Sequence, residues 1–446
     1  MIRSTALRNL VFVAIFLASF ATFVLRAVNA GVLHDPPETG DGHDYDAIAY
    51  NLWQGRGFGY YWSDPGWREP YQGIRRFRLV LRRRSEYYPT TYRPPAMPAL
   101  LSAVYAVADR NFAAWRIVNC AIMAGAVTTG AMIAAQFGGV AAAVATALLV
   151  LLSPHLTYYS QRFLTEALAT MLLALVAFAW VKAARDGWTL TRSLVSGVLF
   201  GALMAARSIF VLSLPVVLLL PGQAGPGLKL WRAKALCIFT ALAVMSPWWI
   251  RNITVTGAFM PLGTQGGINL PMGFGPRALA SEGIWRSNPE DGWPEIAARD
   301  LGRVESEVQL AKFRTSSTLT WMRQHPIDVL RLMGLHVWQE IRPRGVPYSD
   351  WLLPAAVLAV AVLRKVPGVG VLALLACANL AIIAITYSAG GRFMVPLEPL
   401  LVALVGVMIS TLAAHAMPRS IRFHIDTQTS ESDSNESGAP QKGTRS

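Results

Sequence analysis

The sequence predicts an all-α protein that crosses a membrane about ten times, within a range of roughly eight to twelve crossings. Hydrophobic residues make up 53% of its 446 residues, and charged residues make up only 15%. A soluble globular protein has about 25% charged residues. The charges also lie between apolar stretches, most of which reach the roughly 17–25 residues needed to span hydrocarbon. The formal net charge of +14 therefore indicates contact with lipid head groups and basic cytoplasmic loops rather than with nucleic acid.

The first predicted span covers about 9–30. Arg3 and Arg8 precede it, and the excess of basic residues in cytoplasmic segments places the N-terminus in the cytoplasm. The stretch also resembles a signal peptide, with Val28-Asn29-Ala30 as a cleavage site. Its apolar run is long for a signal peptide, and the later spans need a first crossing, so we expect an uncleaved anchor.

A long polar loop, 31–113, is expected to follow on the non-cytoplasmic side, which is the periplasm of a Gram-negative cell. Within it, 96–108 is apolar but too short to cross easily, so we expect a helix on the membrane surface. A second loop on the same side covers 251–325, and 326–341 is again expected at the interface.

Further spans are expected at about 114–136, 140–157, 163–183, 193–207, 208–221, 235–250, 349–363, 367–388 and 392–413. The stretches 193–207 and 208–221 are short, so they are expected to tilt or to lie partly within protein. The loops on the opposite side carry Lys182, Arg185, Arg192, Lys229, Arg232, Lys234, Arg364, Lys365 and Arg419, which makes them cytoplasmic. The spans and loops form one domain over 1–415, and the polar tail 424–446 is expected to be disordered in the cytoplasm.

Three carboxylates, those of Asp41, Asp44 and Asp46, follow the first span directly. Neighbouring like charges and partial burial raise the pKa of a carboxyl group, which suits a general base. The alternative is structural: an acidic turn that caps a helix beginning near Asp46. The pattern of residues leaves both interpretations open at this point.

Four arginines fall at one depth on the non-cytoplasmic side: Arg93, Arg207, Arg251 and Arg392. Two prolines follow Arg93, and their fixed φ angles hold it near the membrane plane. A guanidinium group can donate two charge-assisted hydrogen bonds to one phosphate, so these arginines suit an anionic lipid head group. Each side chain could instead simply extend to the membrane surface. Four arginines on the non-cytoplasmic side, however, oppose the usual excess of basic residues on the cytoplasmic side.

Glu166 opens a predicted span, where a carboxylate close to hydrocarbon is costly and marks a candidate functional residue. The alternatives are an ion pair with Arg162 or a favourable charge at the helix N-terminus.

In their order along the chain, these clusters resemble the motifs of the GT-C glycosyltransferases that use polyprenyl-phosphate sugars. The matching motifs are Asp41 with Tyr45, Ala47-Ile48-Ala49-Tyr50-Asn51-Leu52, Gly55-Arg56-Gly57-Phe58, Arg93-Pro94-Pro95, Arg116, Glu166, Pro247 to Asn252, Gly266-Gly267-Ile268-Asn269, and Arg392 with Pro396 and Pro399. The similarity covers about 10–415. It is nearest to the protein-mannosyltransferase and aminoarabinose-transferase type, including the bacterial lipopolysaccharide-core transferases.

The resemblance implies a GT-C bundle whose first periplasmic loop carries surface helices and the catalytic acid. It implies transfer of a sugar, with inversion, from a polyprenyl-phosphate donor to a hydroxyl group of a cell-envelope glycan or lipid at the inner membrane. By register, the catalytic acid is Asp41 rather than Asp46, and Asp44 is a second acid. The residues expected to bind the donor phosphate are Arg93, Arg207, Arg251 and Arg392. Further active-site candidates are Tyr45, Glu166, Asn252 and Asn269.

The chain departs from the family pattern by an insertion, 62–88, that contains a dense run of arginines. The members expected to contact an anionic acceptor or lipid head groups are Arg75, Arg76, Arg82, Arg83 and Arg84. The alternative is a solvated basic loop.

A transporter or flippase for a lipid-linked sugar would also need arginines at head-group depth. Such proteins usually carry ionisable groups at mid-bilayer and broken helices in paired halves, and the sequence has neither pattern. A nucleotide sugar would need a Gly-rich phosphate loop after a strand, which is also absent from the sequence. Cys120, Cys237 and Cys377 lie in apolar runs without metal or disulfide spacing. We expect that no cofactor is required, although the carboxylates could hold a divalent cation.

Overall fold

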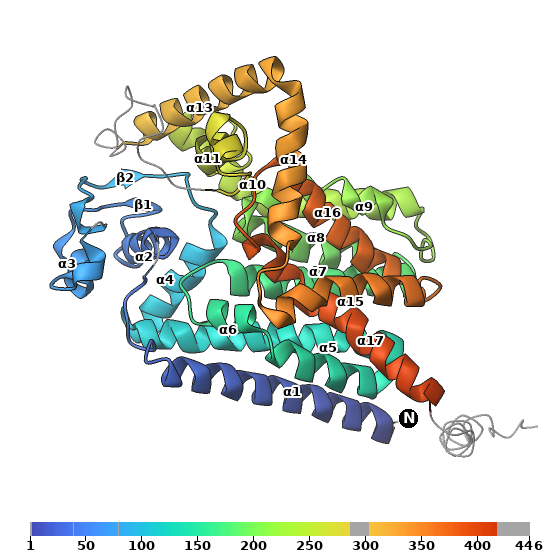
Figure 1. The fold of residues 1–446 in the computed structure, drawn as a ribbon. Coiled ribbons are helices and arrows are strands. Elements are labelled where there is room, and N and C mark those ends of the chain that lie inside the picture. The colour runs from blue at the N-terminus through green and yellow to red at the C-terminus, as the bar shows by residue number, and fades with distance from the viewer. Residues whose placement is uncertain (1, 39, 79, 286–302, 417–446) are drawn as a thin grey trace, which may run out of the picture.

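The apolar segments form α-helices, the conformation in which a chain within lipid satisfies its own backbone hydrogen bonds. Figure 1 shows these helices, in a computed structural model, running roughly parallel with a smaller polar region at one end. The structure describes residues 2–38, 40–78, 80–285 and 303–416, so the predicted disordered tail lies outside the described residues. The described stretches long and apolar enough to cross a membrane are Ala6–Asn29, Phe112–Leu151, Glu166–Asp186, Leu230–Thr256 and Arg392–Ala416. The chain is therefore a multi-pass, all-α membrane protein.

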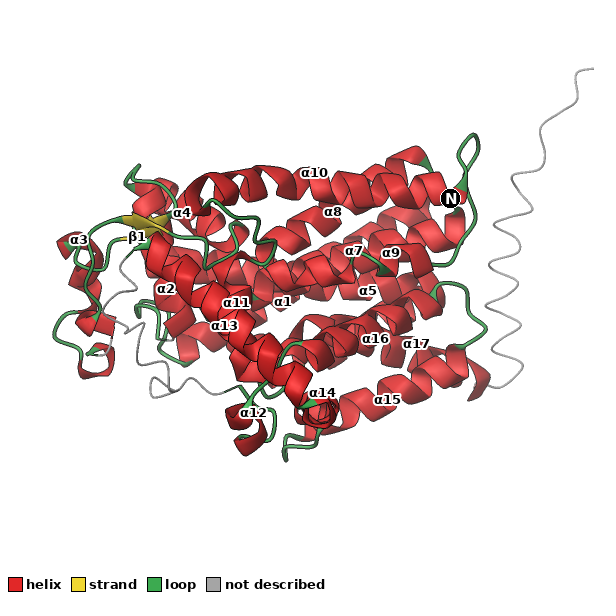
Figure 2. Ribbon diagram, turned by 90° about the horizontal axis from the view of Figure 1, so that it is seen from above, coloured by secondary structure: helices red, strands yellow, loops and turns green. Residues whose placement is uncertain are grey.

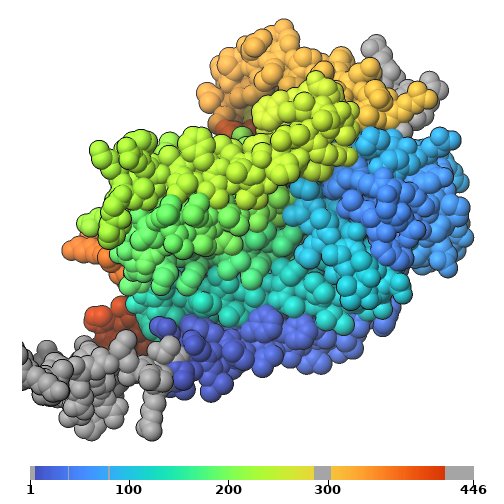
Figure 3. Space-filling view, turned by 180° about the vertical axis from the view of Figure 1, so that it is seen from behind, coloured from blue at the N-terminus to red at the C-terminus, as the bar shows by residue number. Residues whose placement is uncertain are grey.

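Within the described part of the chain, the bundle consists of eight helices. They are α1 (Ile2–Asn29), α5 (Phe112–Leu151), α7 (Glu166–Asp186), α8 (Leu190–Ala206), α10 (Leu230–Thr256), α15 (Pro347–Leu363), α16 (Val369–Ile385) and α17 (Glu398–Ala416). Two long connections, between α1 and α5 and between α10 and α15, leave the bundle. Its short elements are α6 (Pro154–Ser160), the 3-10 helix η4 (Ser208–Ser213), α9 (Val216–Leu219) and the 3-10 helix η6 (Arg392–Leu397). On the reverse face, the chain is layered in sequence order from α1 to α10 (Figure 3).

The polar end is built from short helices and a small antiparallel sheet. It contains α2 (Gly40–Trp53), α3 (Pro65–Arg68), α4 (Ala96–Ala108), and the paired strands β1 (Gly59–Tyr60) and β2 (Tyr88–Pro89). The remaining described elements are the 3-10 helices η1 (Glu69–Tyr71), η2 (Arg75–Phe77) and η3 (Val80–Arg82) and the helices α11 (Gly263–Gly273), α12 (Pro276–Ala280), α13 (Val304–Gln324) and α14 (Pro326–Ile341). Figure 2 shows α13 lying obliquely to the parallel helices of the bundle. The predicted surface segments 96–108 and 326–341 are both helices, as expected.

Two predicted spans, 114–136 and 140–157, fall within α5 and α6. The helical geometry of α5 is interrupted at Gly138 and Gly139, and Gly139 has a φ of 65°, which favours glycine. The second span ends earlier than expected, because Ser153 caps a new helix whose first residue is Pro154. The sequence therefore located the break correctly but overestimated the length of the second helix.

The predicted span 208–221 is wrong as a single helix. The chain forms η4, a turn and the short α9 instead. Pro215 lies between these two elements, and a proline has no N–H to continue a helical hydrogen-bond ladder. This irregular segment packs beside α8 and α16 and so follows the alternative expectation of a stretch partly buried in protein.

The contact between α5 and α17 fixes the last helix in the bundle. A Cβ atom at Gly406 would lie 2.3 Å from Oγ1 of Thr146, and one at Gly130 would lie 3.1 Å from Pro399. Small residues at such positions let membrane helices approach closely. Because η6 leads directly into α17, this packing also anchors the segment that begins with Arg392. The start of α1 and the end of α17 lie together at the end of the bundle opposite the polar region (Figure 1).

Candidate active site

The carboxylate of Asp41 lies between two arginines at the polar end of the bundle. Asp41 is in the first turn of α2, and its Oδ1 lies 2.6 Å from Nη2 of Arg93. Its Oδ2 lies 2.9 Å from Nη1 of Arg392, the first residue of η6. The predicted catalytic acid thus meets two of the predicted phosphate arginines, which come from segments far apart in the sequence.

Asp44 lies on the next turn of α2 and shares Arg93 with Asp41. Its Oδ2 lies 2.6 Å from Nη2 of Arg93, and its Oδ1 lies 2.7 Å from Nη1 of Arg83. The guanidinium group of Arg93 packs against the rings of Tyr45 and Tyr92, whose centroids lie 5.2 Å and 4.8 Å away. Arg93 is 5% exposed, so it forms a buried bridge between the two carboxylates.

Glu166 continues the ion pairs on the other side of Arg392. Its Oε1 accepts a hydrogen bond from Nε of Arg392 and lies 3.6 Å from Nη1 of Arg207. The side chain of Glu166 is fully buried. The alternative of an ion pair with Arg162 is wrong, because Arg162 pairs with Glu38.

These contacts form one chain of alternating charges, which we call the arginine–acid network. Its members are Arg83, Asp44, Arg93, Asp41, Arg392, Glu166 and Arg207. Four arginines alternate with three acids in it, so the network carries an excess of positive charge. Such a site can accept an additional anion without leaving a buried acid unpaired.

The ion pairs determine the protonation of Asp41. Burial raises the pKa of Asp41, but the charges and hydrogen bonds of Arg93 and Arg392 outweigh it and hold the pKa well below its usual range. The expectation of a raised pKa is therefore wrong for this residue, because its closest charged neighbours are positive rather than negative. Burial raises the pKa of Tyr45 to about 12, so its hydroxyl stays neutral.

Asp46 lies in a different environment from that of Asp41. It is fully buried. Its partners are Nε1 of Trp67 at 2.7 Å, the hydroxyls of Tyr71 at 2.7 Å and Tyr105 at 2.6 Å, and the guanidinium group of Arg110. The helix begins at Gly40 rather than near Asp46, so Asp46 is not a capping residue either. Its bonds tie together the polar end of the molecule.

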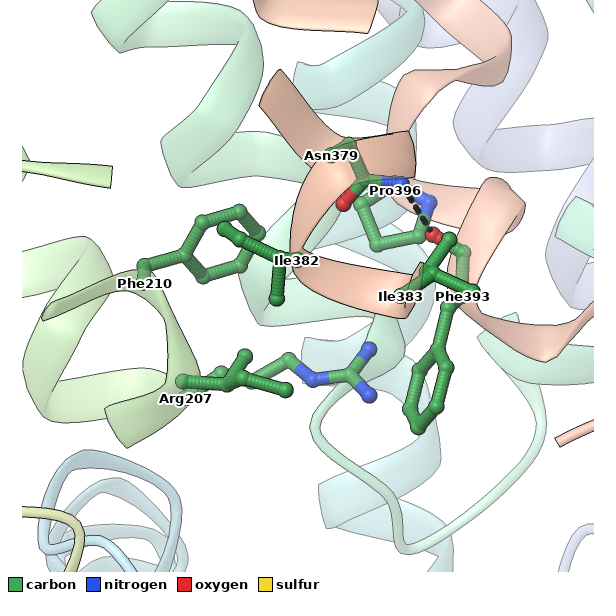
Figure 4. A pocket seen from close by; sticks show the side chains of 8 residues that line it. Arg207, Phe210, Asn379, Ile382, Ile383, Phe393 and Pro396 are labelled. Atoms are coloured by element: carbon green, nitrogen blue, oxygen red, sulfur yellow. Dashed lines mark hydrogen bonds between the residues drawn. The ribbon is translucent and has the colours of Figure 1, made fainter. Parts of the chain in front are cut away.

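A small apolar pocket lies beside Arg207 (Figure 4). Its cavity volume is about 10 Å³, and it is lined by Arg207, Ile209, Phe210, Asn379, Ile382, Ile383, Phe393 and Pro396. A second pocket, also with a cavity volume of about 10 Å³, shares Phe210 and Asn379 with the first and extends toward α7 and α8. Figure 4 shows the guanidinium group of Arg207 close to Phe393, whose ring centroid lies 5.0 Å away. One end of the network therefore borders an apolar recess.

Arg251 does not join the network, although the sequence grouped it with the phosphate arginines. Its Nη1 donates to the carbonyl oxygen of Thr90 at 2.5 Å, and its Nη2 donates to that of Phe58 at 2.7 Å. The side-chain oxygen of Asn252 accepts from Nη1 at 3.2 Å. Arg251 and Asn252 thus support the segment that precedes Arg93 rather than facing Asp41.

The remaining candidates lie around Tyr92. Asn269 places its Oδ1 3.5 Å from the hydroxyl of Tyr92. Gln265, which was not among the predicted site residues, has an amide orientation that satisfies both of its polar atoms. In that orientation its oxygen accepts from Nη1 of Arg93 at 3.1 Å and its nitrogen donates to the carbonyl oxygen of Tyr92 at 3.2 Å. Its position directly before the Gly266-Gly267 motif was the available signal.

The arginine run divides into a part that reaches the network and a part on the surface. Arg83 joins the network, and its guanidinium group lies 4.7 Å from the ring centroid of Trp62. Arg76 pairs with Asp35 at 2.9 Å. Three others are exposed and make no ion pair with any residue that the structure describes: Arg75, Arg82 and Arg84.

No three His, Cys, Asp or Glu side chains among the described residues gather into a group that could hold a metal ion. The oxygens of Asp41 and Asp44 face arginines, as described above. None of the three cysteines is in a disulfide.

No family model matches the sequence, and no curated protein matches it. Solved structures do match. The oligosaccharyltransferase of Archaeoglobus fulgidus, tethered to an acceptor peptide, has a TM-score of 0.50 and 11% identity over 91% of this chain and 51% of its own. The apo form of that protein has a TM-score of 0.50 and 12% identity over 96% of this chain and 53% of its own. ArnT from Cupriavidus metallidurans in the apo state has a TM-score of 0.48 and 14% identity over 91% of this chain and 60% of its own.

The likeness to the archaeal protein shows a shared fold, so the predicted GT-C bundle is confirmed. The chain spans about half the length of that protein (51% and 53% in the two structures).

Proposed function

We propose that this chain transfers a sugar from a polyprenyl-phosphate donor to a hydroxyl group of an acceptor. The observation that carries the proposal is the position of Asp41 between Arg93 and Arg392 at 2.6 Å and 2.9 Å. One site then contains a carboxylate that can accept a proton and guanidinium groups that can stabilise charge on a leaving phosphate. The shared GT-C fold supports the same class of reaction.

The donor's phosphate is proposed to bind Arg392, Arg207 and Arg93. Arg207 lies 3.6 Å from Glu166 and lines the apolar pocket, so a phosphate bound to Arg207 would have Ile382 and Ile383 as apolar neighbours for the start of its hydrocarbon chain, which would have to widen the pocket to enter it. An apolar recess next to a cluster of arginines matches a molecule that joins a hydrocarbon chain to a phosphate. We assign Arg251 a supporting role instead, because its guanidinium group binds two backbone carbonyls and no acid of the arginine–acid network.

The reaction that we propose is a single displacement. The acceptor oxygen bonds to the anomeric carbon while the bond from that carbon to the phosphate oxygen breaks. The hydroxyl proton passes to Asp41, helped by Asp44, and polyprenyl phosphate leaves with the electron pair. Attack opposite the phosphate inverts the anomeric configuration.

Asp41 needs a change of surroundings to act as a base, because two arginines hold its pKa low. A donor phosphate that binds Arg392 would neutralise part of the positive charge next to Asp41. The pKa of Asp41 would then rise, and proton transfer would become more favourable. Donor binding would in this way activate the base only when a leaving group is present.

The exposed arginines of 75–84 are proposed to contact an anionic acceptor or lipid head groups next to Asp44, with Arg83 linking them to the network. We place the site on the periplasmic or outer face of the inner membrane, with both termini cytoplasmic. We expect the acceptor to be a cell-envelope glycan or lipid, with the lipopolysaccharide core as the first candidate. The domain is proposed to cover 1–415, with 31–113 as its catalytic loop.

Detergent-solubilised protein provides the test. It should be incubated with a panel of undecaprenyl-phosphate sugars and an envelope extract as the acceptor source. Release of undecaprenyl phosphate together with labelled product is the expected result. A transporter would release none, because micelles provide no second side, so absence of release with every donor would contradict the proposal.

A further inference from the structure

Two buried glutamates outside the arginine–acid network each bind the segment directly before one of its arginines. The first is Glu340, near the end of α14, which is 3% exposed. Its Oε1 accepts hydrogen bonds from Oγ of Ser388 at 2.9 Å and from the backbone N–H of Ala389 at 2.6 Å. Its Oε2 accepts from the backbone N–H of Phe393 at 3.2 Å. These donors enclose Arg392 on both sides in the sequence.

The turn that Glu340 binds is tight. Gly390 and Gly391 have φ angles of 68° and 92°, and a Cβ atom at Gly391 would lie 2.1 Å from Nη1 of Arg344. Arg392 follows immediately and turns its side chain toward Asp41. The direction of that side chain therefore depends on a backbone turn, and Glu340 satisfies two of the N–H groups of that turn.

The second glutamate is Glu307, in the first turn of α13, which is 4% exposed. Its Oε2 accepts from Oγ1 of Thr90 at 2.7 Å, and its Oε1 accepts from the backbone N–H of Thr91 at 3.2 Å. The hydroxyl of Thr264 also donates to Oε1. This segment continues through Tyr92 to Arg93.

Neither glutamate forms an ion pair with a residue that the structure describes. A buried carboxylate without an ion-pair partner is costly unless hydrogen bonds satisfy it. Arg251 attracts Glu307 and Arg344 attracts Glu340 only from beyond ion-pair distance, so hydrogen bonds satisfy both carboxylates, and most of the donors belong to 90–91 and 388–393. Burial raises the pKa of both Glu307 and Glu340. A hydrophobic side chain could fill the same space without the free-energy cost of burying a carboxylate. The buried carboxylates therefore indicate that these segments must be held in a defined position.

We propose that Glu307 and Glu340 are positioning residues that hold Arg93 and Arg392 at the spacing required to share Asp41 and a donor phosphate. They act through the backbone of 90–92 and 388–393 and touch no reacting atom. Because α13 and α14 are consecutive helices, the pair sets the positions of both arginines from one structural unit. This inference rests on the proposed function above.

The test combines two measurements on the full chain in detergent. Hydrogen–deuterium exchange reports the order of 388–393 and 88–95, and titration with undecaprenyl phosphate reports phosphate binding. Glu340→Ala should increase exchange in 388–393 and weaken binding by about 10-fold to 100-fold, the loss of one charge-assisted hydrogen bond. Glu307→Ala should do the same through 88–95.

Conservative and control variants separate positioning from general damage. Glu340→Gln keeps one carbonyl acceptor for Ser388 and Ala389 but turns an amide NH₂ group toward the N–H of Phe393. It should therefore recover only part of the binding and of the protection that Glu340→Ala loses, and it provides a second readout if the alanine variant folds poorly. Glu305→Gln and Asp328→Asn alter acids on the same two helices that have no such contacts, and both should behave like the wild type.

Two results would contradict these assignments. If Arg392→Gln loses binding while Glu340→Ala and Glu307→Ala retain wild-type exchange and affinity, the positioning role is wrong and the proposed function stands. If Arg392→Gln itself binds undecaprenyl phosphate as tightly as the wild type, the phosphate role of the network is wrong. The exchange data would then still decide whether the glutamates order the two segments.

Discussion

Oδ2 of Asp41 lies 2.9 Å from Nη1 of Arg392, although the two residues are 351 positions apart in the chain. The first polar helix after α1 and the entry to the last helix therefore meet at one point. A carboxylate that shares a guanidinium group with Glu166 is held ionised and oriented at once.

Removing one arginine of the network should weaken donor binding without unfolding the protein. Arg392→Gln and Arg207→Gln should each weaken binding of undecaprenyl phosphate by about 10-fold to 100-fold, because a charge-assisted hydrogen bond is lost. Arg323→Gln is the matched control, since Arg323 is exposed in the last turn of α13 and forms no ion pair with a residue that the structure describes. Titration by intrinsic fluorescence or native mass spectrometry measures the affinities. If all three variants lose the same affinity for undecaprenyl phosphate, the network arginines have no special role in binding the donor.

The pH profile of the free enzyme should lack an acid limb from Asp41. The active form of this base is ionised, and Arg93 and Arg392 hold its pKa below the usual range, so lowering the pH from 8 to about 5 leaves it ionised. We therefore expect kcat/KM, which reports ionisation in the free enzyme, to stay flat on this side. A limb with a midpoint near pH 6 that disappears in Asp41→Asn would contradict the ion pairing.

Asp46 should matter for stability rather than for transfer. Asp46→Ala leaves Arg110 buried without its partner, which costs about 3–5 kcal/mol of unfolding free energy. Thermal unfolding in detergent should show the loss, while the folded fraction keeps its transfer rate per molecule. If Asp46→Ala unfolds normally but loses transfer, then the choice of catalytic acid by register is wrong.

The surface arginines should affect the acceptor and not the donor. Replacing Arg82 and Arg84 with Gln should raise the KM for the envelope acceptor by roughly twofold to fivefold and flatten its salt dependence, because exposed charges mainly steer encounter. The affinity for undecaprenyl phosphate should stay unchanged. Arg83→Gln should differ by lowering kcat as well, since Arg83 contacts Asp44. If all of these variants instead weaken the affinity for undecaprenyl phosphate to the same extent, these arginines bind the lipid donor and not the acceptor.

Most of the fold was predictable because long apolar runs and charged loops have few alternatives in lipid. The span at 208–221 was not, because its composition is apolar throughout while Pro215 interrupts its hydrogen bonding. The contacts of Asp41 with Arg93 and Arg392 were predictable as a group from motif order and depth. The sequence could not exclude Arg251 from the predicted phosphate-binding arginines, because the depth of a residue in the membrane does not determine the direction of its guanidinium group.

Two features of the site had no clear sequence signal. Glu307 lies in a polar helix where a carboxylate is unremarkable, and its burial depends on contact with Thr90 and Thr264 from other segments. The low pKa of Asp41 was also missed. Local sequence places acids beside it, whereas the folded chain brings arginines closer.

The most direct measurement compares wild type and Asp41→Asn for two properties in the same preparation: affinity for undecaprenyl phosphate and rate of sugar transfer. The variant frees Arg93 and Arg392 from a competing carboxylate, so it should bind undecaprenyl phosphate at least as tightly as the wild type. Its transfer rate should fall by about 10²-fold to 10⁴-fold, the usual contribution of a general base. Transfer at the wild-type rate by this variant would contradict the assignment of Asp41 as the base.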